Sequence, residues 1–243
     1  MRRALLLAFL ALPLLLAGPT AAQDLSLSLG DGDSLAGRSM LIIGGITILS
    51  LAPGLAIMIT CFPFVVTVFS ILRQAIGLQQ APPNMLIISL SLFLTWFIME
   101  PVFSESWAIA IKPLMDGAID LPTAFREGIT PFRGFMANRA DPETYAALAA
   151  LRPDTAPITS LTDAPLSTLV PSFMLSEITR AFEIGFLVYL PFLIIDLVVS
   201  AVLMSMGMMM VPPAVVSMPF KLAFFVVADG WTLLSSALVR SYF

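Results

Sequence analysis

The chain has 243 residues, of which 58% are hydrophobic and only 12% are charged. Soluble domains are about 45–50% apolar and about 25% charged, so this composition argues against a soluble enzyme and favours a membrane or a large assembly. The net charge of −4 argues against nucleic-acid binding, and the absence of histidine removes the commonest general base and metal ligand.

The first 22 residues have the pattern of a cleavable secretory signal peptide. Met1-Arg2-Arg3 is a basic start, residues 4–16 are apolar, and small residues end at Ala22. Because the apolar stretch is too short to cross a hydrocarbon core of about 30 Å comfortably, we expect cleavage after Ala22. An uncleaved anchor is the alternative. Residues 23–39 are polar and predict a flexible lead-in.

The remainder predicts an all-α fold with two long, kinked hydrophobic helical hairpins. The first spans residues 40–111 and the second residues 168–243, with a polar extracytoplasmic region, residues 112–167, between them. Within the polar region, residues 123–138 and 142–151 predict short helices. After removal of the signal peptide, an even number of apolar runs places both termini and the polar region outside the cytoplasm.

Prolines predict where the apolar runs bend or stop. A helix over residues 40–72 would be longer than a bilayer needs, so we expect kinks at Pro53-Gly54 and at Pro63. In the second run, Glu100-Pro101 predicts a helix break. The single cysteine, Cys61, lies in an apolar stretch and is interpreted as a small buried hydrophobe.

The turn of the second hairpin carries three consecutive methionines, Met208, Met209 and Met210. Neighbours on a helix lie about 100° apart, so the three cannot share one face. The residues expected to shape this turn, and its counterpart in the first hairpin, are Gly207, Pro212, Pro213, Pro82 and Pro83. Flexible thioethers at a hairpin tip suit a deformable seal, a channel gasket; an ordinary turn packed in a core is the alternative.

Six ionisable residues interrupt the second hairpin: Glu177, Arg180, Glu183, Asp196, Lys221 and Asp229. Charges at membrane depth are costly unless they pair, face a cavity or neutralise. Arg180 lies three residues from both Glu177 and Glu183, a pairing distance on a helix, and Asp196 can pair with Lys221 across the hairpin or between subunits. We interpret the six as charges that specify assembly; a proton relay is the alternative.

Motifs for catalysis are missing from the sequence. It has no glycine-rich phosphate loop, metal-ligand cluster or paired nucleophile and base. The residues therefore predict no enzyme, no metal site and no cofactor.

Several long blocks of the chain resemble the FliP/SctR family of type III secretion export-gate proteins. The blocks are residues 73–84, which end in Gln79-Gln80-Ala81-Pro82-Pro83-Asn84; 132–136; 192–198, which contain Ile194-Ile195-Asp196; 206–213, Met206-Gly207-Met208-Met209-Met210-Val211-Pro212-Pro213; 219–222; and 229–231, Asp229-Gly230-Trp231. The likeness runs from about Met40 to the C-terminus and is weakest over residues 141–163. The signal peptide fits the flagellar branch of the family better.

The resemblance implies a pore-forming core subunit of the flagellar export gate, which passes unfolded flagellar subunits through the basal body. Such proteins self-associate into a helical or ring-like pore with FliQ and FliR, beside other export-apparatus membrane proteins in the bacterial inner membrane. The resemblance also implies that Met208 to Met210 form the channel gasket, and that the chain has no cofactor, catalysis or nucleic-acid partner. A virulence-type gate subunit and a proton-coupled membrane transporter are the alternatives.

Overall fold

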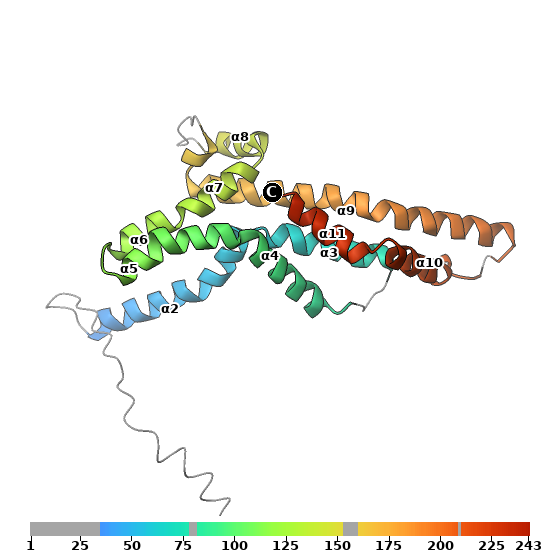
Figure 1. Ribbon diagram of the computed structural model, residues 1–243, viewed down its shortest axis with the longest axis horizontal. Coiled ribbons are helices and arrows are strands. Elements are labelled where there is room, and N and C mark those ends of the chain that lie inside the picture. Colours follow the sequence, from blue (N-terminus) through green and yellow to red (C-terminus); the bar gives the residue numbers. More distant parts are fainter. Residues whose placement is uncertain (1–34, 78–81, 153–159, 209) are drawn as a thin grey trace, which may run out of the picture. The chain divides into compact units, whose positions relative to one another are not determined.

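The computed structural model describes residues 35–77, 82–152, 160–208 and 210–243, so the predicted signal peptide, most of the lead-in and Met209 lie outside the described residues. The helices in chain order are α2 (Leu35–Met58), α3 (Phe62–Ile76), α4 (Asn84–Ser106), the π-helical turn η1 (Trp107–Ile111), α5 (Lys112–Met115), α6 (Leu121–Gly128), α7 (Thr130–Arg139), α8 (Pro142–Ala150), the 3-10 turn η2 (Leu161–Asp163), α9 (Leu166–Ser205), α10 (Pro213–Val227) and α11 (Gly230–Arg240). Figure 1 shows these helices, and the described residues include no strand. The predicted all-α fold is confirmed.

Two compact units divide the chain after Ser50. The first contains the start of α2, which begins at Leu35 and so includes residues that the sequence assigned to the lead-in. Everything described below concerns the second unit, residues 51–243.

Two of the prolines expected to bend or break the apolar runs, Pro53 and Pro101, lie inside continuous helices. Helix α2 continues through Pro53-Gly54, and the chain breaks only just before Pro63, in the first turn of α3 where proline's missing N–H is not needed. The break predicted at Glu100-Pro101 is wrong, because α4 continues to Ser106 and into η1. A helix break leaves backbone N–H and C=O groups without their helical hydrogen bonds. In apolar surroundings no water replaces those bonds, so a continuous helix is favoured.

Helix α3 lies at the centre of the core. Its buried residues include Val65, Val68, Phe69 and Leu72, the spacing of one helical face. This face packs along α9, and α4 and α10 also contact α3 (Figure 1). The closest approach is at Gly185 of α9, where an added Cβ would lie 2.3 Å from Ile71 Cδ1.

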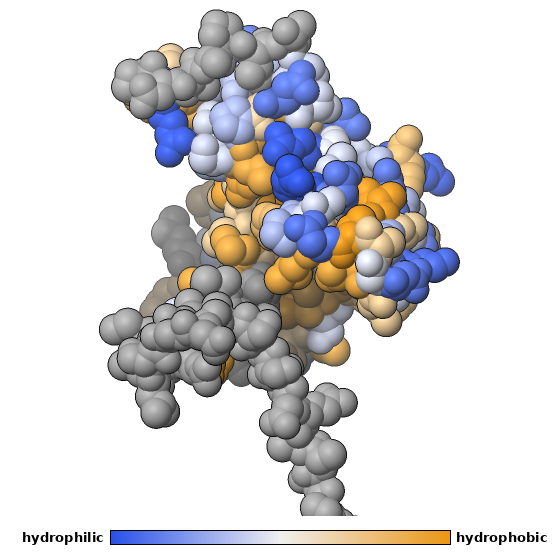
Figure 2. All heavy atoms as spheres, turned by 90° about the vertical axis from the view of Figure 1, so that its left-hand side faces the viewer, coloured by the Kyte–Doolittle hydropathy of each residue, from blue (hydrophilic) through white to orange (hydrophobic). Residues whose placement is uncertain are grey.

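Helices α7 and α8 of the polar region fold onto the first half of α9, while α5 and α6 pack against η1. The helix predicted over residues 123–138 is two helices, α6 and α7, and the one predicted over 142–151 is α8. A second cluster, which includes Met136, Tyr145 and Phe173, packs α7 and α8 against α9. Figure 2 shows many hydrophilic side chains in the upper half of one face, and Figure 1 draws α7 and α8 uppermost.

Two stretches of the described chain are long and apolar enough to cross a membrane, Asn84–Met115 and Leu166–Ser205. A third is possible if α10 and α11, which meet at a 60° bend, form one broken span. These stretches provide both arms of the second hairpin and the second arm of the first.

Candidate functional site: the methionine turn and two buried charge clusters

The methionine turn joins α9 to α10 through a tightly bonded helix end. Backbone bonds run from Gly207 N to Met204 O and from Met208 N to Leu203 O, both 3.0 Å, and Gly207 is left-handed with φ 73°. This pair of bonds is the Schellman arrangement, which favours glycine at the left-handed position. Pro212 and Pro213 then begin α10, where the first N–H groups have no helical partner to lose.

Methionine side chains on this turn face outward. Met210 is 97% exposed, Met206 66% and Met208 42%. A packed core turn would bury them, so these three side chains do not serve as core within this chain. The structure therefore leaves an exposed, apolar, flexible group of side chains on a rigid frame.

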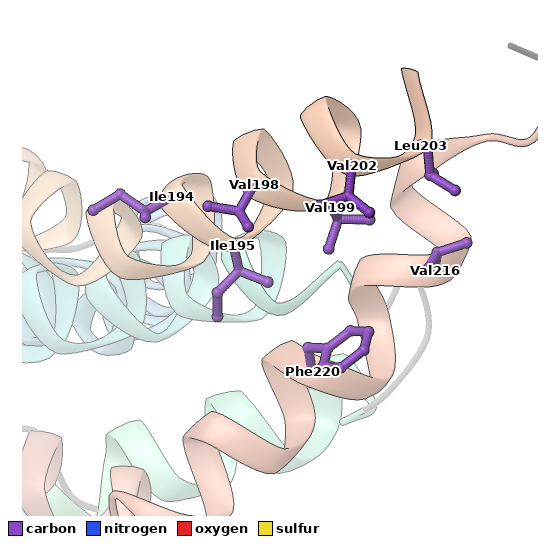
Figure 3. A pocket seen from close by; sticks show the side chains of 8 residues that line it. All are labelled: Ile194, Ile195, Val198, Val199, Val202, Leu203, Val216 and Phe220. Carbon is purple, nitrogen blue, oxygen red and sulfur yellow. The ribbon is translucent and has the colours of Figure 1, made fainter. Parts of the chain in front are cut away.

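An apolar groove of about 450 Å³ lies beside the turn, between α9 and α10. Six aliphatic residues of α9 between Ile194 and Leu203 line it, together with Val216 and Phe220 of α10 (Figure 3). No polar side chain lines the groove. It suits an apolar occupant and offers nothing to orient a polar ligand.

Lys221 and Asp196 form an ion pair across the second hairpin. Lys221 Nζ lies 2.6 Å from Asp196 Oδ2 and donates to the carbonyl of Ala75 at 3.0 Å. The Ser217 hydroxyl donates to the other Asp196 oxygen at 2.6 Å. Lys221 is only 5% exposed, and its position next to the last turn of α3 suits a cation, because the final carbonyls of a helix lack helical donors.

Glu177 lies at the centre of a second cluster and is fully buried. It accepts from Arg139 Nε at 3.0 Å and from Arg180 at 3.3 Å. The hydroxyl of Tyr242 also donates to it. These contacts join α7, α9 and the C-terminal residues.

The other two predicted charges stand apart from these clusters. Glu183 is exposed on α9 and makes no ion pair with any residue that the structure describes. Asp229 occupies the bend between α10 and α11 in a left-handed conformation, φ 48° and ψ 49°. Its contribution is to the backbone corner rather than to a described ion pair.

Pro82 and Pro83 precede α4, and Pro83 is its N-cap residue. Arg73, in the last turn of α3, donates to the side chain of Asn84 at the start of α4. That bond closes the turn of the first hairpin, whose residues 78–81 lie outside the description. Both proline pairs therefore stand immediately before or at the start of a hairpin's second arm.

Sequence reasoning missed four participants: Arg139, Tyr242, Ser217 and the carbonyl of Ala75. Arg139 and Tyr242 lie 38 and 65 residues from Glu177 in sequence, so no helical spacing connects them. Ser217 lies one helical turn before Lys221, so its spacing in the sequence could have indicated that it joins the Lys221 cluster. Within the described ranges, no three His, Cys, Asp or Glu residues are placed to hold a metal ion.

Comparison with known proteins gives consistent similarities. The model of the FliP family matches residues 45–238. A flagellar biosynthetic protein FliP from Caulobacter vibrioides is 47% identical over 236 residues, covering 97% of this chain and 88% of that protein. Proteins of the same name from Agrobacterium fabrum and Bacillus subtilis are 44% and 46% identical, covering 96% and 81% of this chain and 95% and 89% of their own lengths.

Proposed function

The chain belongs to the FliP family, and from this premise we propose that it is a pore-forming core subunit of the flagellar type III protein export gate. Its relatives are named flagellar biosynthetic proteins, which favours a flagellar gate over a virulence-type one. In this proposal it is a multi-pass protein of the inner membrane, within the basal body. It self-associates and binds FliQ and FliR, beside other export-apparatus membrane proteins, while unfolded flagellar subunits pass through the pore.

The observation that carries the proposal is the exposure of the methionine turn. A protein-conducting pore must close against ions and yet open around a passing chain. Thioether side chains are flexible, polarisable and uncharged, so a ring of them can close a pore by excluding water and reopen at low cost. The Gly207 end of α9 and the prolines of α10 hold the base of this turn fixed, which leaves motion to the side chains.

Replacing Met208, Met209 and Met210 together by alanine tests the gasket. We expect a higher ion conductance of assembled gates in planar bilayers, because alanine side chains are too short to close the same opening. The control is Met115→Ala. Met115 is also exposed, at 73%, but it is the last residue of α5 and lies outside the hairpin turn. Unchanged conductance in the triple variant would remove the gasket from the proposal.

The charges and the groove support assembly. In the proposed gate, the apolar groove between α9 and α10 and the exposed apolar faces of both hairpins are covered by neighbouring subunits. The ion pair of Asp196 and Lys221 would set the hairpin geometry that those neighbours meet. The polar region, residues 112–167, would remain extracytoplasmic, with the hairpins of residues 40–111 and 168–243 as assembly elements.

Purification of the gate tests the partners and separates this function from a proton-coupled transporter. The proposal predicts a large hetero-oligomer in which mass spectrometry identifies several copies of this chain with FliQ and FliR. A transporter predicts this chain alone, as a monomer or small oligomer. The two functions also differ in the expected phenotype, because only a gate subunit is required for motility.

A further inference from the structure

The last residues of the sequence contact the buried cluster around Glu177 within the same chain. We propose that four residues form a docking site for a phenolic side chain: Glu177, Arg139, Phe64 and Phe135. In this structure the side chain that occupies the site is Tyr242 of the same chain. The docked tail acts as a latch. It joins the end of the second hairpin to α3 of the first hairpin and to α7 of the polar region.

Every part of the Tyr242 side chain has a matching contact. Its ring lies edge-on to Phe64, with centroids 5.6 Å apart and planes at 79°, and stacked on Phe135 at 5.9 Å and 14°. The guanidinium carbon of Arg139 lies 4.1 Å from the ring centroid, a cation–π distance. At the far end, the hydroxyl donates to Glu177.

Arg139 connects the tail to the cluster in two further ways. Its Nη1 donates to the backbone carbonyl of Ser241 at 2.9 Å, while its Nε holds the Glu177 carboxylate at 3.0 Å. One guanidinium therefore fixes the backbone of the tail, the face of the tail's aromatic ring and the acceptor of its hydroxyl. This combination selects a phenol, since a benzene ring without the hydroxyl leaves one Glu177 oxygen without its donor.

The protonation state of the tail suits this role. Burial, and after it the negative charge of Glu177, raise the pKa of Tyr242 well above its usual value. The phenol therefore keeps its proton and remains a donor at all physiological pH values. The neighbouring Phe243 is 77% exposed, so the docking site takes Tyr242 and leaves the final side chain outside.

The single cysteine provides a reporter of latch opening. Cys61 is fully buried, three residues before Phe64, in the core cluster against which Tyr242 packs. A buried thiol is modified only when the structure opens locally. The rate at which a maleimide modifies Cys61 in the full chain, purified in detergent, therefore measures how often this part of the core opens.

Three variants give the test. Tyr242→Ala should raise the Cys61 modification rate about tenfold, because it removes a hydrogen bond to a charged group and two aromatic contacts. Tyr242→Phe, which loses only the hydroxyl, should raise it about threefold. Phe243→Ala is the matched control and should stay within about twofold of the unmodified chain. If Tyr242→Ala fails to fold, the Cys61 modification rate of Tyr242→Phe alone tests the latch.

Ligand rescue tests the chemical class. In Tyr242→Ala, millimolar p-cresol should return the Cys61 rate towards that of the unmodified chain, and toluene should do so much less, as it cannot donate to Glu177. The latch is overturned if Tyr242→Ala and Tyr242→Phe leave the rate unchanged, or if Phe243→Ala raises it as much as Tyr242→Ala. Equal protection by p-cresol and toluene, or none by p-cresol, overturns the phenol site.

Discussion

Asp229 and Gly230 make the backbone corner between α10 and α11. Asp229 is the one non-glycine residue with positive φ in the described ranges, a conformation that aspartate tolerates better than most side chains. A Cβ on Gly230 would lie 2.1 Å from Phe225 Cε2. The Phe225 ring meets Trp231 edge-on at 5.4 Å, so it has little room to move away. Local structure therefore explains why each residue of the Asp229-Gly230-Trp231 block suits its position.

Gly230→Ala should lower the free energy of unfolding by about 1–3 kcal/mol, the usual cost of forcing atoms into a packed site. Thermal unfolding in detergent measures it. Gly134→Ala is the matched control, because Gly134 lies inside α7 with open space around its Cα, and there alanine should stabilise the helix by about 0.5–1 kcal/mol. Two equal shifts of the same sign would contradict the steric explanation.

At the scale of the elements, one glycine sets how closely the two hairpins meet. Gly185 lets α9 approach α3 so that Ile71 lies against its backbone. Small residues at a helix crossing allow such contact. The contact is direct evidence that the first arm of the second hairpin packs against α3.

Gly185→Ala should cost about 1–2 kcal/mol, because the new methyl group must displace Ile71. Adding Ile71→Ala should recover part of the loss, since the two residues are in contact and their effects are coupled. Unfolding of the two single variants and the double variant gives the coupling energy. Strictly additive losses would show that the clash does not occur.

Helix α8 begins with a cap whose strength depends on pH. Asp141 Oδ2 accepts from the Thr144 amide at 2.8 Å and from the Thr144 hydroxyl at 2.7 Å. The bond from the Thr144 hydroxyl has the largest effect and the bond from the Thr144 amide the next largest, and together they hold the pKa of Asp141 below its usual value. A lowered pKa means that the ionised cap stabilises the folded state fully above the usual aspartate pKa of about 3.9 and loses this effect as pH falls through the lowered value.

Asp141→Ala should therefore speed hydrogen exchange of the Thr144 amide relative to the unmodified chain at pH 7, and the difference should shrink as pH falls through the lowered pKa of Asp141. Asp141→Asn is the control. Asparagine keeps the cap but does not ionise, so its effect on exchange should be small and independent of pH. A pH dependence in the asparagine variant equal to that of the unmodified chain would exclude Asp141 as the titrating group.

At the scale of the whole molecule, the two charge clusters connect segments that are far apart in the chain. Lys221 reaches the end of α3, 146 residues away, as well as Asp196. The cluster around Glu177 connects α7, α9 and the C-terminal residues. In each cluster the acid is paired with a basic side chain of the same chain, which supports structural charges over a proton relay, although the buried Nη2 of Arg139 has no partner among the described residues.

Asp196→Asn should destabilise the chain by about 2 kcal/mol. It leaves the buried Lys221 without its anion, although the 36% exposure of the Asp196 side chain moderates the loss. Combining it with Lys221→Met should lose less than Asp196→Asn alone, because no unpaired charge remains. Unfolding of the single and double variants measures the two losses of stability. Size-exclusion chromatography measures the yield of the proposed gate from each variant.

Charge reversal of the same pair tests its role in assembly. Asp196→Lys and Lys221→Asp should each impair assembly, and the double swap should restore it only in part. Restoration is partial because an acid at position 221 would face the carbonyl of Ala75 at the negative end of α3. If the swap restores neither assembly nor motility, the pair does not specify assembly.

The sequence by itself determined the helical class and the family, because long apolar runs and long motifs are local features, and it predicted the polar region between two hairpins. It also located the methionine turn, whose glycine and prolines act on neighbouring backbone. Only the tertiary structure decided that prolines inside α4 and α9 do not break them, that Arg139 and Tyr242 surround Glu177, and that Lys221 caps α3. These depend on contacts between residues distant in sequence, where burial and the lack of competing water, more than local preference, decide which polar groups must meet.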